Sequence, residues 1–183
     1  TSEKTIDSKL GAKSLEKLIV AGIAGFVIIF FFLIAIYRAA GVMASISLFL
    51  YVMLVLSIIK ALGIVLTLAS IAGLILSIGM AIDANILIFE RIKVELGKGH
   101  KMKEAAKTGF KKSWSAIWDS NVTGFIVAMI LFIFGINLIK WFGLMLALWI
   151  MVSLFTAMYV SRVLVIFLAD TFTDKWLFIG FKK

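Results

Sequence analysis

Residues 79–93 read GMAIDANILIFERIK, an apolar run that holds one carboxylate and one amide before it ends in charged residues. From residue 61 to residue 89, Asp83 is the only charged side chain. An ionised Asp at the centre of a bilayer costs about 2.5–3.5 kcal/mol on insertion scales, so an acid in such a place indicates function by default. The sequence therefore predicts that Asp83 is reversibly protonated as the protein moves.

The composition around this run is that of a membrane protein. Of the 183 residues, 63% are hydrophobic and 16% are charged, against about 45–50% and about 25% in soluble domains. A soluble fold of this composition would expose apolar patches larger than monomers normally carry. Intrinsic disorder requires low hydrophobicity and high charge, which are both absent here. The chain has no cysteine and one histidine, so disulfides, thiolate metal sites and sites with two imidazoles are excluded.

Five long uncharged runs predict five transmembrane helices, because about 20 apolar helical residues cross a hydrocarbon core about 30 Å thick. None of the runs alternates between polar and apolar residues, as a transmembrane strand would. The predicted fold is an all-α membrane protein, a five-helix transmembrane bundle over residues 18–169. Its spans are predicted at about 18–37, 41–59, 67–90, 120–137 and 141–168.

The distribution of basic residues predicts the orientation of the chain. Most of the 19 Lys and Arg residues fall in the loop 91–118 or on the same side of the bilayer. By the positive-inside rule, this loop and the basic tail 170–183 are cytoplasmic, and the polar lead-in 1–17 is outside.

The loop itself predicts an amphipathic helix between the third and fourth spans. From Met102 onward, one stripe of the helical wheel collects apolar residues, namely Met102, Ala106, Phe110, Trp114 and Ile117. This pattern favours either a helix in the membrane interface, with its lysines toward anionic headgroups, or a cytoplasmic hairpin packed on the bundle. Neither alternative implies nucleic-acid binding, although the net charge is +9.

Two faces of the third span carry candidate site residues. Gly79 and Glu90 lie within about 40° of Asp83 on the helical wheel, so Asp83 with Glu90 forms a candidate proton relay. On another face, small residues at four-residue spacing indicate helix packing, with Asn85 as an interhelical hydrogen-bond donor. This ladder consists of Gly73, Ser77, Ala81 and Asn85.

The last two spans offer weaker candidates. The fourth span opens with Asp119, and Asp119 or Ser120 is expected to cap its N-terminus. Asp119, Asn121 and Thr123 are also candidates for helix packing or interhelical hydrogen bonds. Arg162 is expected to anchor the fifth span at the cytoplasmic face.

Known catalytic patterns are missing from the sequence. Aspartyl intramembrane proteolysis needs two intramembrane aspartates, and only one is present. Gly-x-Ser-x-Gly, His-Glu-x-x-His and Walker motifs do not occur, and no metal site is predicted. We expect a protein that is not an enzyme and that draws energy from an ion gradient or from a partner ATPase.

Residues 79–93 resemble the signature of the SecD family, membrane subunits of the bacterial protein-export machinery within the resistance-nodulation-division (RND) superfamily. The resemblance covers about residues 9–169. It extends through Leu10-Gly11, Tyr37-Arg38, Ala105-Ala106, Gly109-Phe110-Lys111, Asp119-Ser120-Asn121-Val122-Thr123, Gly135, Gly143, Ser153-Leu154-Phe155-Thr156-Ala157 and Arg162. One departure is Ala69-Ser70, where many relatives have Pro-Gly.

The resemblance implies a SecD-like membrane domain without its first transmembrane helix and its periplasmic domain. It implies a place in the bacterial plasma membrane, a SecF-like half as partner, and association with the SecYEG channel. In this family the proton-motive force assists translocation of unfolded polypeptides, with no cofactor beyond the proton gradient, and Asp83 aligns with the proton-relay aspartate. Two alternatives stay open: a structural or assembly module, and half of an RND-type proton-driven exporter.

Overall fold

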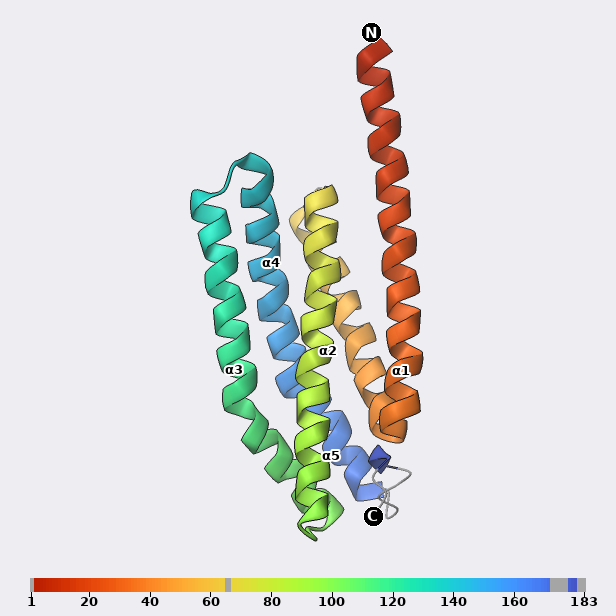
Figure 1. The fold of residues 1–183 in the computed structure, drawn as a ribbon, viewed down its shortest axis with the longest axis vertical. Helices are drawn as coiled ribbons and strands as arrows, with labels where there is room; N and C mark the ends of the chain where they lie inside the picture. The colour runs from red at the N-terminus through yellow and green to blue at the C-terminus, as the bar shows by residue number, and fades with distance from the viewer. Residues whose placement is uncertain (1, 65–66, 172–177, 181–183) are drawn as a thin grey trace.

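The computed structural model describes residues 2–64, 67–171 and 178–180, with side chains from Glu16 onward except at residues 69, 138 and 171. Within these ranges all regular secondary structure is helical. The elements are α1 (Ser2–Leu62), α2 (Leu68–Gly97), α3 (Met102–Phe134), α4 (Asn137–Phe155), a π-helical segment (Thr156–Val160) and α5 (Ser161–Thr171). Figure 1 shows them standing side by side along the long axis of the molecule.

Helix α1 is interrupted by a reversal at Arg38. This residue has φ 51° and ψ −124°, which are not helical angles. In Figure 1 the first part of α1 descends from the N-terminus, and the second part turns back and rises behind α2. The backbones on the two sides of the turn touch, since a Cβ on Gly41 would overlap the carbonyl oxygen of Leu33. Glycine is the residue that permits such a close approach.

The number of long helices differs from the number of predicted spans. Among the described residues, four helices are long and apolar enough to cross a membrane, where the sequence predicts five spans. The difference arises because the predicted spans 18–37 and 41–59 both lie within α1. The four stretches are Glu16–Leu62, Ser70–Gly97, Met102–Phe134 and Ile139–Asp170.

The structure has no separate amphipathic helix between the third and fourth predicted spans. Helix α2 continues to Gly97, and α3 begins at Met102 and runs without a break to Phe134. The predicted loop 91–118 is therefore reduced to a turn over residues 98–101. The apolar stripe of its helical part packs on the bundle: Met102, Ala106, Phe110 and Ile117 are buried. Trp114 was placed in the same stripe, but its side chain is 48% exposed.

Polar side chains join or begin helices at a few positions. Tyr51 Oη and Ser77 Oγ lie 2.6 Å apart between α1 and α2. Ser161 donates to Ser47 Oγ at 2.7 Å between α5 and α1. At the start of α2, Thr67 and Ser70 form a capping box, in which each side chain accepts from the other residue's backbone N–H. Hydrogen bonds of this kind add to close packing, which is the main force between helices in a bilayer.

A close contact between α2 and α3 at Gly109 yields a stability prediction. A Cβ on Gly109 would lie 2.5 Å from Ile92 Cγ1 and 3.0 Å from the Ile92 backbone nitrogen. We expect Gly109→Ala to lower the melting temperature of the purified chain in detergent, because overpacking of this kind costs about 1–3 kcal/mol.

The matched control for this prediction is Gly25→Ala. Nothing lies within 4 Å of a Cβ built on Gly25, and Ala is the better helix former by about 1 kcal/mol. This variant is expected to melt at or above the temperature of the parent chain. Equal melting temperatures for Gly109→Ala and the parent would show that α2 and α3 are not in tight contact.

Candidate functional site

Asp83 lies on a face of α2 that points out of the bundle. Ala72, Gly79 and Glu90, which share its side of the helix, are exposed as well. A Cβ built on Gly79 would meet nothing within 4 Å. In the part of the chain that the structure describes, Asp83 makes no hydrogen bond or ion pair. The carboxylate therefore lies on an open surface lined by small side chains, inside the apolar stretch Ser70–Gly97.

A small cavity lies beside Asp83, between α2 and α3. Its volume is about 40 Å³, enough for about three water molecules. Ser120 and Asn121 of α3 contribute its other polar groups. The lining residues are Met80, Asp83, Ala84, Leu87, Ala116, Ile117, Ser120 and Asn121. The acid can thus reach polar groups of the neighbouring helix across a space that admits water.

The predicted packing ladder lies on the inner side of α2. Gly73, Ser77, Ala81 and Asn85 are all buried. A Cβ on Gly73 would come within 3.7 Å of the Phe142 ring, so this end of the ladder faces α4. Asn85 behaves differently from the expectation, because its side-chain amide donates to the Ala81 carbonyl of its own helix at 3.2 Å.

Two buried polar atoms have no hydrogen-bond partner among the described residues. They are Asn85 Oδ1 on α2 and Trp149 Nε1 on α4. A buried polar atom without a hydrogen-bond partner lowers the stability of the fold by about 1–3 kcal/mol. The core therefore holds two destabilising polar atoms, on the neighbouring helices α2 and α4. Sequence reasoning did not single out Trp149, because an indole in an apolar run is indistinguishable from ordinary core.

Glu90 is held by two residues that the sequence analysis did not identify. Tyr37 Oη donates to Glu90 Oε1 at 2.9 Å, and Lys93 Nζ lies 3.0 Å from the same oxygen. Lys93 also sits 4.4 Å above the Tyr37 ring. Seven residues separate Glu90 from Asp83, which is about 10 Å along the helix. These contacts tie α2 to the residue before the reversal in α1.

The predicted residues of the fourth span lie within an unbroken helix. Since α3 starts at Met102, the expectation that Asp119 or Ser120 caps a helix is wrong. Asn121 donates to the Ile117 carbonyl and Thr123 to the Asp119 carbonyl, each at 2.8 Å. Both bonds are internal to α3 and join no second helix.

Arg162 lies on α5, close after the π-helical segment. Its side chain is exposed. The structure does not bring it together with Asp83 or Glu90 through any hydrogen bond or ion pair of the described residues.

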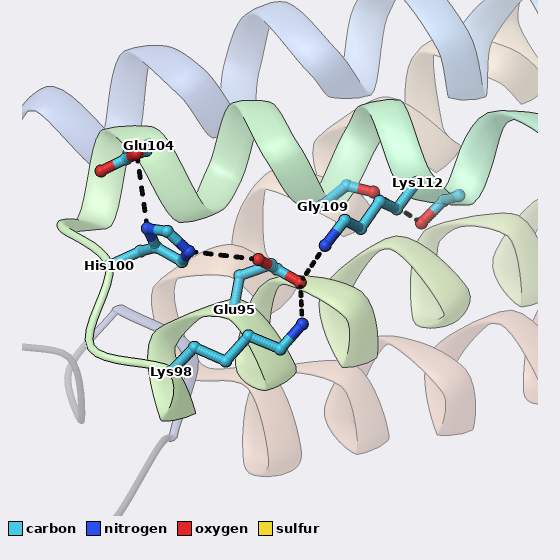
Figure 2. A network of polar contacts seen from close by, with 7 residues as sticks. Glu95, Lys98, His100, Glu104, Gly109 and Lys112 are labelled. Carbon is cyan, nitrogen blue, oxygen red and sulfur yellow. Dashed lines mark hydrogen bonds and ion pairs between the residues drawn. The ribbon is translucent and has the colours of Figure 1, made fainter.

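An ionic cluster around the buried Glu95 carboxylate closes the turn between α2 and α3, as Figure 2 shows. The Glu95 side chain is 3% exposed, and its Oε1 accepts from Lys98 and from Lys112 at 2.8 Å each. His100 Nε2 lies 3.5 Å from Glu95 Oε2, and His100 Nδ1 lies 3.4 Å from Glu104. The hydrogen bond to Glu95 raises the pKa of Lys98, so the lysine stays charged. This cluster joins the last turn of α2 to α3 across 17 residues.

The cluster is a structural device rather than a metal site. Among the described residues, no group of three or more His, Cys, Asp or Glu side chains is arranged to hold a metal ion. The lysines neutralise the Glu95 carboxylate, and charge-assisted hydrogen bonds of this type are the strong ones.

Removal of the Glu95 charge provides a test of this device. In Glu95→Gln, Lys98 and Lys112 lose their common anionic partner, so we expect a lower melting temperature and faster amide hydrogen exchange at residues 96–104. Glu104→Gln is the matched control, because Glu104 is exposed and, among the described residues, its one ion pair is with His100. Exchange rates in Glu95→Gln equal to those in the control would contradict a role for Glu95 in closing the turn.

The chain resembles known proteins in both sequence and structure. Residues 1–171 match the family model of the protein export membrane protein SecD/SecF, C-terminal. SecD of Synechocystis is 46% identical over 163 residues, which is 89% of this chain and 34% of that protein. SecDF of Bacillus subtilis is 41% identical over 173 residues, which is 94% of this chain and 23% of that protein. The chain thus spans about a third or less of these relatives.

A solved structure has the same fold. The crystal structure of SecDF from Thermus thermophilus, a translocon-associated membrane protein, superposes with a TM-score of 0.83 at 35% sequence identity. The likeness covers 87% of this chain and 22% of that one.

Proposed function

This chain belongs to the SecD/SecF family of protein-export membrane proteins, and we propose that it is the membrane part of a subunit that uses the proton-motive force to assist polypeptide translocation. Its relatives carry the name protein translocase subunit. The proposed substrate is an unfolded polypeptide in export, and the proposed partners are a SecF-like half and the SecYEG channel. No cofactor other than the proton gradient is involved.

The observation that carries this proposal is the outward position of Asp83. A carboxylate on the surface of a hydrocarbon-spanning helix is expensive unless protein covers it. The small side chains of Gly79 and Ala72 on the same exposed face allow another helix to approach closely. A homologous half that packs on this face would enclose Asp83 and supply the remaining groups of a proton path.

Proton exchange at Asp83 would then bias the packing of the two halves. The neutral acid is compatible with a dry interface, whereas the carboxylate requires water or a partner donor, for which the 40 Å³ cavity offers room. A proton that crosses 100 mV releases about 2.3 kcal/mol, which corresponds to a shift of about fiftyfold between two arrangements. This is enough to drive a change between two packings of the bundle.

The proposed topology has five membrane crossings, with α1 contributing two on either side of Arg38. The reversal at Arg38 supports this count, since each half of Glu16–Leu62 exceeds the length needed for one crossing. By the positive-inside rule, the turn at residues 98–101 and the C-terminus are cytoplasmic and the N-terminus is outside. The membrane is the bacterial plasma membrane.

Neutralisation of Asp83 tests the proton role. In the full-length protein with its partner half, we expect Asp83→Asn to abolish stimulation of export by the proton-motive force while membrane insertion is unchanged. Asp83→Glu keeps a titratable group and is expected to retain part of the activity. The measurement is translocation into inverted membrane vesicles with and without a proton gradient. Full stimulation in Asp83→Asn would leave only a structural or assembly role for the chain.

Cysteine crosslinking tests the proposed interface separately. The chain has no cysteine, so single substitutions give unambiguous products. We expect Gly79→Cys to crosslink to cysteines placed in the membrane part of the partner half. Phe31→Cys, on a part of α1 where Phe31 is 65% exposed, is the matched control and is expected to stay unlinked. Equal yields at the two positions would contradict a partner on the Asp83 face.

A further inference from the structure

One exposed face of α3 carries lysines followed by two tryptophans. At 100° per residue, these five side chains fall within about 80° of the helical wheel. All are exposed, with Trp114 at 48% and Trp118 at 47%. We call this face the lysine–tryptophan stripe, and it consists of Lys103, Lys107, Lys111, Trp114 and Trp118.

The two indoles form an ordered pair at the C-terminal end of the stripe. The Trp114 and Trp118 rings are stacked with their centroids 6.3 Å apart and their planes 7° from parallel. From Trp118 to the end of α3 at Phe134 the helix rises about 24 Å, most of the thickness of a hydrocarbon core of about 30 Å. The pair therefore stands where hydrocarbon gives way to headgroups, the depth that tryptophan prefers.

The lysines continue the stripe away from the hydrocarbon. Lys111 lies about 4.5 Å and Lys107 about 10.5 Å beyond Trp114 along the helix axis. A headgroup layer is about 5–7 Å thick on each side of the bilayer. The ammonium group of Lys111 thus lies within the headgroup layer, and the flexible side chain of Lys107 reaches it.

Two of the lysines lack a partner within the described residues. Lys103 is paired with Asp170 at 2.9 Å, and Lys112, beside the stripe, is paired with Glu95. No hydrogen bond or ion pair of the described residues involves Lys107 or Lys111. Glu104 lines the same shallow depression as Lys107, but it lies 3.4 Å from His100 and forms no ion pair with Lys107. The free positive charge of the stripe is therefore concentrated at Lys107 and Lys111.

We propose that the lysine–tryptophan stripe is a binding site for an anionic phospholipid. The headgroup phosphate binds between Lys107 and Lys111, the indoles of Trp114 and Trp118 lie against the glycerol region, and the acyl chains run along the apolar part of α3. Charge complementarity selects an anionic lipid, since each Lys near an anionic membrane surface increases binding about fivefold. Three of the four α3 residues that line the cavity beside Asp83, namely Ala116, Ile117 and Ser120, lie outside the 80° arc of the stripe on the helical wheel. The lipid site and the proposed proton path thus use largely different residues of α3.

A lipid titration followed by native mass spectrometry tests the proposal. The purified chain is titrated in detergent with dioleoylphosphatidylglycerol, and with dioleoylphosphatidylcholine as the neutral reference. We expect the parent chain to retain the anionic lipid preferentially, and Lys107→Gln/Lys111→Gln to raise its Kd at least tenfold with no change for the neutral lipid. Lys60→Gln/Lys140→Gln removes the same charge from two other exposed lysines and is expected to bind as the parent does.

Three results would overturn the proposal. The first is an unchanged Kd for phosphatidylglycerol in Lys107→Gln/Lys111→Gln. The second is an equal loss of binding in Lys60→Gln/Lys140→Gln, which would reduce the effect to overall charge. The third is that an acidic protein segment, rather than a lipid, occupies the stripe. If a polyglutamate peptide binds the parent and not the Lys107/Lys111 variant while lipid binding is the same in both, the stripe is a site for an acidic polypeptide.

Discussion

A carboxylate on the outer surface of an apolar helix makes this bundle incomplete in a bilayer. Several other polar side chains in the helices have hydrogen-bond partners: Ser45 donates to the Gly41 carbonyl at 2.8 Å, and Tyr51 pairs with Ser77 of the neighbouring helix. Asp83 has no such partner in the described part of the chain. Its desolvation cost can be removed by protonation, by water in the adjacent cavity, or by a protein that covers it.

The α2–α3 pair is built as a rigid unit around this acid. At one end of the pair, the buried Glu95 binds Lys98, at the start of the connecting turn, and Lys112 of α3. About one helical turn away from this cluster, the Gly109 backbone lies directly against Ile92. Asp83 on α2, and the cavity beside it that α2 and α3 both line, lie further along the same two helices. A change in protonation at Asp83 would therefore move α2 and α3 together against the rest, because close-packed elements shift as bodies rather than bend.

The sequence predicted the features that depend on local chemistry. The lengths of the uncharged apolar runs predicted where the apolar helices lie. The four-residue spacing of small residues pointed to Gly73 and Ser77, which are buried. It could not predict features set by tertiary contacts. The predicted spans 18–37 and 41–59 already imply a reversal near Arg38, but the sequence does not predict the positive φ that this non-glycine residue adopts. It also does not predict that α3 runs unbroken through Asp119, with its first half packed on α2. The Tyr37–Glu90 and Glu95–Lys112 contacts join residues 53 and 17 positions apart, beyond any helical period.

The π-helical segment Thr156–Val160 has a consequence for the register of everything after it. Such a segment contains one residue more than the α-helix that it interrupts, and the extra residue turns the following helix by about 100°. That turn points Ser161 and Val165 into the bundle, where both are fully buried. A one-residue deletion here would yield a more regular helix, yet it would rotate α5 so that Ser161 leaves Ser47. The π-helical segment thus keeps α5 in the orientation in which Ser161 contacts Ser47.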